Sequence, residues 1–307
     1  MENVFDCVIV GYGPCGIGAS LVLKQAGLNI TIIEKDTPGG KVNIAPRVDN
    51  YPGFTKIPGP DLAVELVKRA KAAEVPVIMD EILSLTKEED NLFLLLGKKG
   101  EYHAKTVLIA CGTLERKLGL EREDEMLGHG LSYCAICDGH FFKGKDILVA
   151  GGGNAALKEA LYLSSFVKHI YLIHRRNQFR GLAPLVKEIK EVPNITIMTP
   201  YVPVKILGDD HITGMRIRNV ETNEEKDLDV EGFFPLVGQI PSTQYINIPG
   251  VKNEYNCIPV DNATRQTSVP GLYAGGDVLP REIKQIYLSE FDGKTAAKNI
   301  IEYLKTL

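Results

Sequence analysis

The segment 132–141 reads SYCAICDGHF and places Cys134 and Cys137 three residues apart, with Asp138 directly after the second thiol. Two thiols at this spacing can form a redox dithiol, supply half of a zinc site, or be small inert residues in a turn. A zinc site needs four ligands, and the chain has no second closely spaced Cys or Cys/His pair. An inert pair would lie in an apolar periodic run, whereas polar residues follow this one. The pattern therefore favours a redox dithiol.

The composition restricts the class of protein. The chain has 307 residues and a formal net charge of −4, so no global field favours nucleic acid or an anionic membrane surface. No apolar run approaches the roughly 18 residues of a membrane span, and the N-terminus does not resemble a signal peptide. We expect a cytoplasmic protein of two domains, without a nucleic-acid or membrane partner. The remaining cysteines have no disulfide-scaffold spacing and are expected to be passive: Cys7, Cys15, Cys111 and Cys257.

The segment 5–34 has the pattern of a βαβ unit that binds a dinucleotide. An apolar run at 7–10 predicts a strand buried on both faces, a helical apolar stripe follows, and Gly27 is placed to end that helix. A second apolar strand is expected at 30–33 and leads into Glu34. Between the first strand and the helix stand the glycines of a G-x-G-x-x-G motif: Gly11, Gly13 and Gly16.

The segment 146–176 repeats this pattern with the same spacing. A strand at 147–150 leads into Gly151, Gly152 and Gly153, a helix that includes Ala156 follows, and a second strand is expected at 170–173 before His174. One glycine motif is a weak signal, but two complete units in one chain predict two dinucleotide-binding domains. The alternative is two ordinary βαβ units whose glycines serve only tight turns.

The end of the second strand in each unit indicates which dinucleotide binds there. Glu34 can accept hydrogen bonds from ribose hydroxyls and would repel a 2′-phosphate, so the first unit suits FAD or NAD. His174 is followed by Arg175, Arg176 and Arg180, and guanidinium groups bind phosphate bidentately, so the second unit suits NADPH. A solvated charged turn is the alternative for the arginines. Near the C-terminus, Asp277 follows two glycines and could contact the hydroxylated chain of a cofactor.

Eight motifs make the sequence closely resemble the low-molecular-weight thioredoxin reductases, a branch of the pyridine nucleotide-disulfide oxidoreductases. They are GYGPCG, TPGGKV, NYPGF, IACGT, CAICDG, GGGNAA, HRRNQFR and GLYAGGDV, and they span nearly the whole chain. The resemblance implies an α/β fold of two Rossmann-like domains, with the NADPH-type domain inserted into the FAD domain. The expected bounds are 1–115 and 243–307 for the FAD domain and 116–242 for the NADPH-type domain, which carries the CxxC pair. A homodimer is also implied.

The resemblance assigns cofactor contacts by position. The expected FAD contacts are Gly11, Gly13, Pro14, Gly16, Glu34, Lys35, Gly40, Lys41, Asn50, Gly112, Gly276, Asp277, Lys284, Gln285 and Ile286. The expected NADPH contacts are Gly153, Ala156, His174, Arg175, Arg176 and Arg180. No metal site is expected.

The resemblance also implies the roles of the dithiol. Cys137 would face the flavin and receive its electrons, and Cys134 would attack the disulfide of thioredoxin. Asp138 would protonate the departing thiolate, which requires a carboxyl group that burial keeps partly protonated near neutrality. Linkers are expected near 114–120 and 238–242, and in the family the inserted domain rotates about them to present either nicotinamide or the cysteine pair to the flavin.

Several positions depart from the family pattern. Lys41 replaces the usual Gln, Cys111 the usual Thr, and Lys158 adds a positive charge to the second helix. The largest departure is 283–293, IKQIYLSEFDG, where small residues usually follow an Arg-Gln pair. A crowded flavin face would hinder nicotinamide docking, so the expected NADPH-dependent thioredoxin reductase has an alternative that takes electrons from reduced ferredoxin. Two further alternatives are a dithiol oxidase of the same fold and a non-enzymatic redox or nucleotide sensor.

Overall fold

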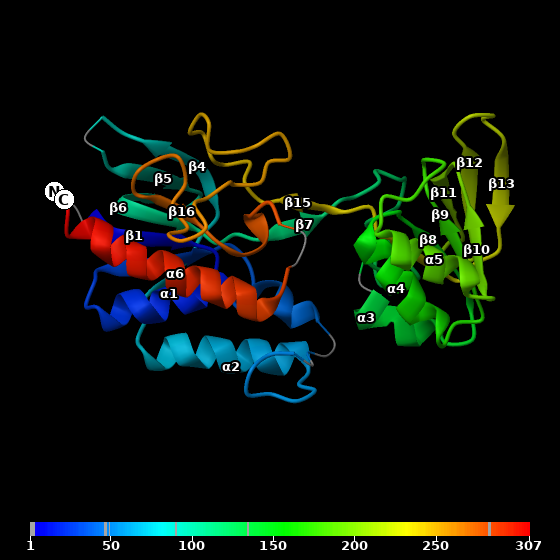
Figure 1. Cartoon of the computed structure of the whole chain (residues 1–307), viewed down its shortest axis with the longest axis horizontal. Helices are drawn as coiled ribbons and strands as arrows, with labels where there is room; N and C mark the ends of the chain where they lie inside the picture. Colours follow the sequence, from blue (N-terminus) through cyan, green and yellow to red (C-terminus); the bar gives the residue numbers. More distant parts are fainter. Residues whose placement is uncertain (1–3, 46–47, 49, 90, 134, 282–283) are drawn as a thin grey trace. The chain divides into compact units, whose positions relative to one another are not determined.

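The computed structural model describes residues 4–45, 48, 50–89, 91–133, 135–281 and 284–307, and the chain forms two compact units (Figure 1). Unit 1 comprises Met1–Leu114 and Ile240–Leu307, and unit 2 comprises Glu115–Gln239. The chain crosses between the units twice, through β7 (Thr113–Glu115) and β15 (Gln239–Pro241). These two strands pair with each other as a separate two-stranded sheet. Unit 2 is therefore an insertion into unit 1.

Unit 1 is built on a seven-stranded sheet in the order β3-β2-β1-β6-β5-β4, with β16 also paired to β6. The pairs among β3, β2, β1, β6 and β16 are parallel, and β5 is antiparallel to both of its neighbours. The strands are β1 (Val4–Val10), β2 (Ile30–Glu34), β3 (Val77–Met79), β4 (Ile82–Lys87), β5 (Phe93–Gly97), β6 (Glu101–Ile109) and β16 (Leu272–Ala274).

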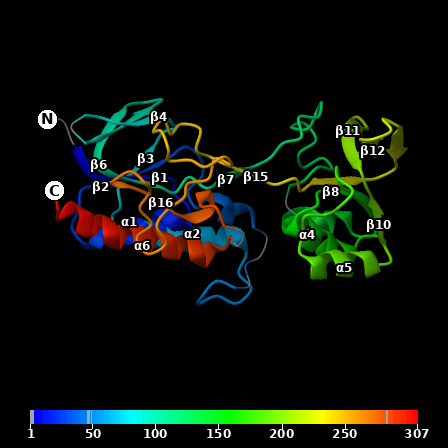
Figure 2. The same cartoon turned by 45° about the horizontal axis from the view of Figure 1, so that its top comes forward.

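Helices cover one face of this sheet. α1 (Pro14–Gln25) and α6 (Ile286–Leu304) lie side by side, as Figure 2 shows, and α2 (Gly59–Ala72) packs on α1. Cys7 and Ile9 of β1 belong to the core on the helix side, whereas Val8 and Val10 belong to the core on the opposite side. Because both faces are covered, the buried part of β1, Cys7–Val10, is an unbroken apolar run rather than an alternating one. Two short 3₁₀ helices complete the unit: η1 (Gly40–Ile44) and η3 (Gly276–Val278).

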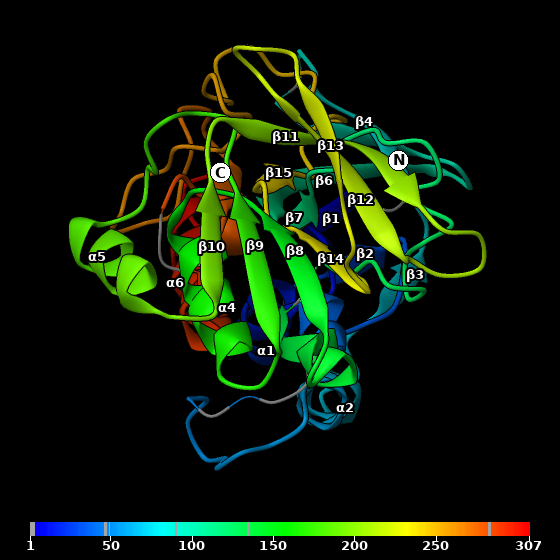
Figure 3. The same ribbon diagram turned by 90° about the vertical axis from the view of Figure 1, so that its right-hand side faces the viewer.

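Unit 2 contains a four-stranded parallel sheet in the order β10-β9-β8-β14, three of whose strands stand side by side in Figure 3. An antiparallel sheet of β11, β12 and β13 lies beside it. α4 packs on β8 and β9, and α3 packs on α4. The elements are α3 (Ala135–Asp138), η2 (Gly139–Phe142), β8 (Asp146–Ala150), α4 (Asn154–Ser164), β9 (His169–Ile173), α5 (Ala183–Glu191), β10 (Ile195–Met198), β11 (Tyr201–Leu207), β12 (Gly214–Asn219), β13 (Glu225–Leu228) and β14 (Gly232–Pro235).

The predicted fold class is confirmed, because each unit contains a βαβ element with a glycine loop between its first strand and its helix. β1, α1 and β2 form the first, and β8, α4 and β9 form the second. The units divide after residues 114 and 239, and the divisions expected from the sequence were after 115 and 242. The observed divisions fall within β7 and β15, the two strands through which the chain crosses between the units. None of the helices in the described part of the chain is both long and apolar enough to cross a membrane.

Candidate functional site

The glycine loop of unit 1 combines close backbone contacts with one open position. A Cβ on Gly11, whose φ is +111°, would lie 2.4 Å from the carbonyl oxygen of Ala110. A Cβ on Gly16 would lie 2.0 Å from the carbonyl oxygen of Gly11, so the helix can approach the strand only with glycine there. Gly13, directly before α1, has no atom within 4 Å of its missing Cβ. The first turn of α1, which begins at Pro14, therefore borders free space, the arrangement that binds a pyrophosphate.

Glu34, the last residue of β2, fixes this loop and lines a cavity. Its Oε2 accepts the backbone N–H of Tyr12 at 2.7 Å, and its Oε1 accepts that of Asp36 at 2.8 Å. A cavity of about 320 Å³ lies at the ends of β1 and β2. Its lining includes Gly11, Glu34 and Lys35. The three residues were predicted from the sequence to contact one cofactor, and the structure places them around one cavity.

Both sequence segments of unit 1 contribute to the wall of this cavity. The Cys111 thiol donates to the carbonyl oxygen of Ser242 at 3.1 Å, and the Ser242 N–H donates to the carbonyl oxygen of Gly112, also at 3.1 Å. Gly112 has a φ of +66°, a backbone conformation that suits glycine. Ser242 and Tyr245 line the cavity but were missed from the sequence, because Ser242 is the last residue of an expected linker and Tyr245 follows it in a stretch without a motif.

Other predicted flavin contacts come together from distant parts of the chain. The Asn50 side-chain amide donates to Oε1 of Gln285 at 2.8 Å, although the two residues are far apart in sequence. Lys41, one of the departures from the family pattern, reaches Oγ1 of Thr113 with its Nζ at 2.9 Å. A Cβ on Gly40 would lie 3.3 Å from Cα of Gly13, so η1 packs directly against the first glycine loop. Lys284 and Ile286 lie on either side of Gln285, where α6 begins.

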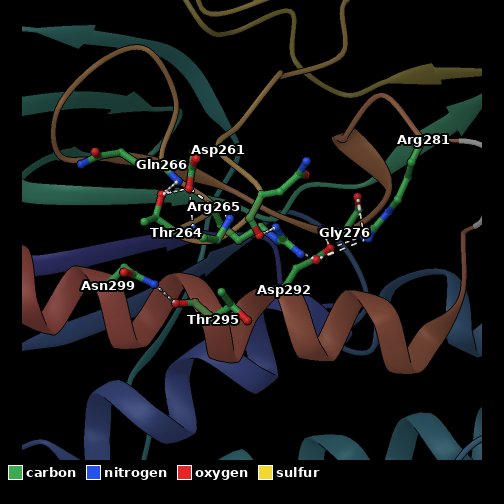
Figure 4. A network of polar contacts seen from close by, with 11 residues as sticks. Asp261, Thr264, Arg265, Gln266, Gly276, Arg281, Asp292, Thr295 and Asn299 are labelled. Carbon is green, nitrogen blue, oxygen red and sulfur yellow. Dashed lines mark hydrogen bonds and ion pairs between the residues drawn. The ribbon is translucent and has the colours of Figure 1, made fainter.

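The turn that carries Asp277 is held by a buried carboxylate of α6, as Figure 4 shows. Asp292 is fully buried, and its Oδ2 accepts the backbone N–H of Gly276 at 2.8 Å. Its Oδ1 accepts a hydrogen bond from Nε of Arg265 at 2.9 Å, and both Nη atoms of Arg281 contact the same carboxylate. Two partly buried arginines thus pair with the carboxylate of Asp292, which is itself closed to water.

The departure at 283–293 contributes a second paired acid. Glu290 is buried and accepts a hydrogen bond from the hydroxyl of Tyr51. Burial, with Glu290 as the next cause, raises the pKa of Tyr51 to about 12. Nζ of Lys294 lies 2.5 Å and Nη1 of Arg69 lies 3.8 Å from the Glu290 carboxylate. Phe291, in contrast, is 58% exposed.

The glycine loop of unit 2 has the same construction as the first. A Cβ on Gly151 would lie 2.4 Å from the carbonyl oxygen of Leu236, and one on Gly152 would lie 2.5 Å from the His174 ring. Gly153, directly before α4, has no atom within 4 Å of its missing Cβ. Ala156, the fourth predicted position of the loop, is buried in α4. The second loop therefore also offers open space at the start of its helix.

The segment after β9 folds back onto this loop and presents three arginines. The backbone N–H of Arg180 donates to the carbonyl oxygen of Gly152 at 2.7 Å. Arg175, Arg176 and Arg180 are exposed, and within the described residues no acceptor or carboxylate contacts their guanidinium groups. Burial lowers the pKa of His174, and the charges of the three arginines lower it further. This concentration of positive charge suits an anionic group such as a phosphate.

The dithiol segment lies in unit 2. Cys134 is outside the described residues, Cys137 belongs to α3, and the half-buried Asp138 ends that helix. Burial raises the pKa of Cys7 to about 12 and that of Cys111 to about 11. Burial also raises the pKa values of Cys15 and Cys257, so these four thiols outside the dithiol segment are protonated at neutral pH and are poor nucleophiles. The described residues contain no cluster of three or more potential metal ligands of the His, Cys, Asp or Glu type.

Comparison with known proteins establishes the family. Residues 5–293 match the pyridine nucleotide-disulphide oxidoreductase family. A thioredoxin reductase of Mycoplasma pneumoniae is 38% identical, covering 99% of this chain and 96% of that protein. The structure of a thioredoxin reductase of Lactococcus lactis is 32% identical with a TM-score of 0.81, covering 99% of this chain and 100% of that one. A ferredoxin-flavin thioredoxin reductase of Clostridium acetobutylicum is 25% identical with a TM-score of 0.54, covering 99% of both chains. The chain therefore belongs to the pyridine nucleotide-disulphide oxidoreductases and, within them, to the low-molecular-weight thioredoxin reductases.

Proposed function

We propose that this protein reduces the disulfide of a thioredoxin with electrons that pass from NADPH through FAD to the Cys134–Cys137 pair. The observation that carries this proposal is the contrast between the two glycine loops. One loop ends beside the carboxylate of Glu34, and the other lies beside three arginines whose guanidinium groups have no partner among the residues that the structure describes. This contrast supports the binding of two dinucleotides of different charge by one chain.

FAD is the cofactor proposed for unit 1. The cavity beside Glu34 suits the adenosine half, whose ribose hydroxyls would donate to the carboxylate. The open space at Gly13 suits the pyrophosphate, and the turn held by Asp292 presents Asp277 to the chain that leads to the flavin ring. Asn50, Gln285 and the start of α6 are proposed to contact the ring.

NADPH is the cofactor proposed for unit 2. The open space at Gly153 suits its pyrophosphate, and Arg175, Arg176 and Arg180 would bind the 2′-phosphate that distinguishes NADPH from NADH. An electron donor without a 2′-phosphate would leave this group of positive charges without a role. The higher identity to proteins named thioredoxin reductase, 38% and 32% against 25% for the ferredoxin-flavin enzyme, also supports NADPH.

The protein's own groups position the reactants and handle protons. Bound FAD supplies the chemistry of accepting a hydride and delivering electrons to a disulfide. Oxidation of the Cys134–Cys137 dithiol releases two electrons and two protons, and the thioredoxin disulfide takes up both when it becomes a dithiol. Cys134 is proposed to attack that disulfide, and Asp138 to protonate the thiolate that leaves.

Anaerobic stopped-flow spectroscopy of the flavin tests the electron donor. NADPH should bleach the flavin rapidly, NADH slowly and reduced ferredoxin not at all. The Arg175→Ala/Arg176→Ala variant should lose affinity for NADPH by about tenfold or more while its affinity for NADH stays unchanged, because only the 2′-phosphate contact is removed. Bleaching by ferredoxin but not by NADPH would overturn the proposed donor.

The Cys137→Ser variant tests the dithiol. It should still bind FAD and be reduced by NADPH, but it should not reduce thioredoxin. Full turnover with thioredoxin in this variant would contradict the proposal, and rapid peroxide formation without thioredoxin in the unmodified protein would favour a dithiol oxidase. The homodimer implied by the resemblance is tested by light scattering of the same samples.

A further inference from the structure

The short helix α3, which contains Cys137, is held at its first residue by an acid of α4. The backbone N–H of Ala135, the residue after Cys134, donates to Oε2 of Glu159 at 3.1 Å. Ala135 is fully buried, so this N–H depends on a protein acceptor. Just after α3, a Cβ on Gly139 would lie only 2.8 Å from Leu163 of α4. Ala135 and Gly139, at the two ends of α3, therefore both contact α4, and Glu159 lies at the first of them.

Glu159 is near half-ionisation at neutral pH. Burial raises its pKa to about 7, the hydrogen bond from Ala135 acts in the opposite direction, and the charge of Glu115 on β7 raises the pKa further. α3 itself carries Cys137 and Asp138 as titratable groups. On α4, Lys158 directly precedes Glu159. Lys158 is exposed, whereas Glu159 is half-buried.

We propose that Glu159 is a positioning residue of the dithiol reaction: it holds the turn at which α3 begins and thereby sets the placement and the reduction potential of the Cys134–Cys137 pair. The inference rests on the proposed function, in which these two thiols are the redox pair. Sequence reasoning assigned the protonic role to Asp138 alone. The structure adds a second carboxyl group, which accepts a hydrogen bond from the backbone N–H of Ala135, the residue after Cys134.

The direction of the effect follows from electrostatics. A carboxylate near the pair disfavours a thiolate, and a thiolate that is less stable makes the dithiol easier to oxidise. The ionised form of Glu159 therefore makes the pair a stronger reductant for thioredoxin. A neutral amide at the same position would keep the hydrogen bond from Ala135 but would remove this effect.

The test compares the flavin-loaded full-length protein with Glu159→Gln, Glu159→Leu and Glu188→Gln. Glu188 is an exposed acid of α5 in the same unit and provides the matched control. The rate of iodoacetamide alkylation of Cys134 and Cys137 is measured from pH 5 to 9 in reduced protein by peptide mass spectrometry. The reduction potential of the pair is measured by equilibration in dithiothreitol buffers.

In Glu159→Gln we expect alkylation of the more reactive thiol at pH 7 to be about threefold faster, with the inflection of the pH profile at lower pH. A threefold change in the equilibrium constant corresponds to a potential about 14 mV less negative. Glu188→Gln should match the unmodified protein in both measurements. In Glu159→Leu, loss of the acceptor should also accelerate hydrogen exchange at Ala135 and slow thioredoxin reduction, while NADPH still bleaches the flavin.

An alkylation profile and a potential of Glu159→Gln identical to those of the unmodified protein would overturn the inference. This decision does not depend on Glu159→Leu, whose folding could suffer from the unpaired N–H. Failure of the proposed function is recognised separately, because the unmodified protein would then not reduce thioredoxin at all. If it does reduce thioredoxin and Glu159→Gln changes nothing, only the role of Glu159 fails.

Discussion

The carboxylate of Glu34 serves the backbone and the cavity at the same time. Its two oxygens accept the N–H groups of Tyr12 and Asp36, so the glycine loop and the turn after β2 are held by one side chain. The same residue lines the cavity proposed for the adenosine of FAD. Under the proposed assignment, loop conformation and ribose recognition would therefore depend on a single residue.

We expect Glu34→Ala to bind FAD about 30-fold more weakly, because hydrogen bonds to a charged group contribute about 2 kcal/mol. The ratio of flavin to protein absorbance after purification, and FAD titration of the apoprotein, would measure this loss. Glu302→Gln, at an exposed position near the end of α6, should bind FAD normally. Unchanged FAD affinity in Glu34→Ala would show that the cofactor does not use this cavity.

The raised pKa of Glu159 also predicts a pH-dependent stability. Its folded-state pKa of about 7 exceeds the ordinary value of 4.5, so the stabilisation from the protonated form is complete below about pH 4.5 and is lost as the pH rises through 7. Between pH 5 and pH 8, Glu159→Gln should therefore gain about 2 kcal/mol in unfolding free energy relative to the unmodified protein. Denaturant unfolding of both proteins at the two pH values measures this difference. Equal pH dependence in the two proteins would contradict the raised pKa.

At the scale of elements, α6 joins the turn that carries Gly276 and Asp277 to the helix layer. Asp292 holds Gly276 and is balanced by Arg265 and Arg281, while Glu290 reaches Tyr51 and Arg69 on the side of α2. The segment that departs most from the family pattern is thus matched by cations supplied from elsewhere in unit 1.

Replacing Asp292 by Asn should lower the unfolding free energy by about 3 kcal/mol, because two partly buried guanidinium groups lose their carboxylate. The turn at Gly276 should loosen, and FAD should dissociate faster. Thermal unfolding and the rate of flavin release in dilute solution measure both effects. Asp210→Asn, at an exposed turn of unit 2, should leave both quantities unchanged. Retention of normal stability and flavin release in Asp292→Asn would show that Asp292 does not hold the turn.

The sequence was sufficient for elements whose signals are local. An unbroken apolar strand, a glycine motif and a helical stripe follow one another in both βαβ units, so β1, α1, β2, β8, α4 and β9 were predictable. Two of their strands start earlier than expected. β1 starts at Val4 rather than 7 because Asp6 interrupts its apolar run, and β8 starts at Asp146 rather than 147 because its first residue is polar. The family pattern also supplied most of the candidate site residues.

Contacts between distant segments could not be read in the same way. Asn50 meets Gln285, and Glu159 meets the backbone of Ala135, without any pattern that links the paired positions. Glu159 stands in an ordinary amphipathic helix, and its importance depends on which peptide group packs above it. Asp292 likewise has no sequence signal that distinguishes it from a surface acid, because its partners Arg265 and Arg281 lie outside its own helix.

For the whole molecule, the assignment of one dinucleotide to each unit predicts where ligands protect the backbone. Addition of NADP⁺ should slow hydrogen exchange in peptides that cover 150–156 and 174–182 but not in those that cover 10–16 and 30–36. FAD added to the apoprotein should do the reverse, because a ligand stabilises the unit that binds it. Hydrogen-exchange mass spectrometry of the full chain measures both patterns. Protection of 10–16 by NADP⁺ would contradict the assignment.

The pairing of β7 with β15 brings the two ends of unit 2 together. The N–H of Arg116 donates to the carbonyl oxygen of Gly238 at 2.9 Å, and the Gln239 side chain donates to Glu115 at 3.2 Å. A domain whose two ends are adjacent can be inserted, exchanged or removed without separating the strands of the domain that carries it. A chimaera in which the corresponding unit of a relative is joined to unit 1 at β7 and β15 should therefore fold. Under the proposed assignment of the two dinucleotides, donor preference would then change by exchange of one contiguous stretch of gene, while unit 1 stays unaltered.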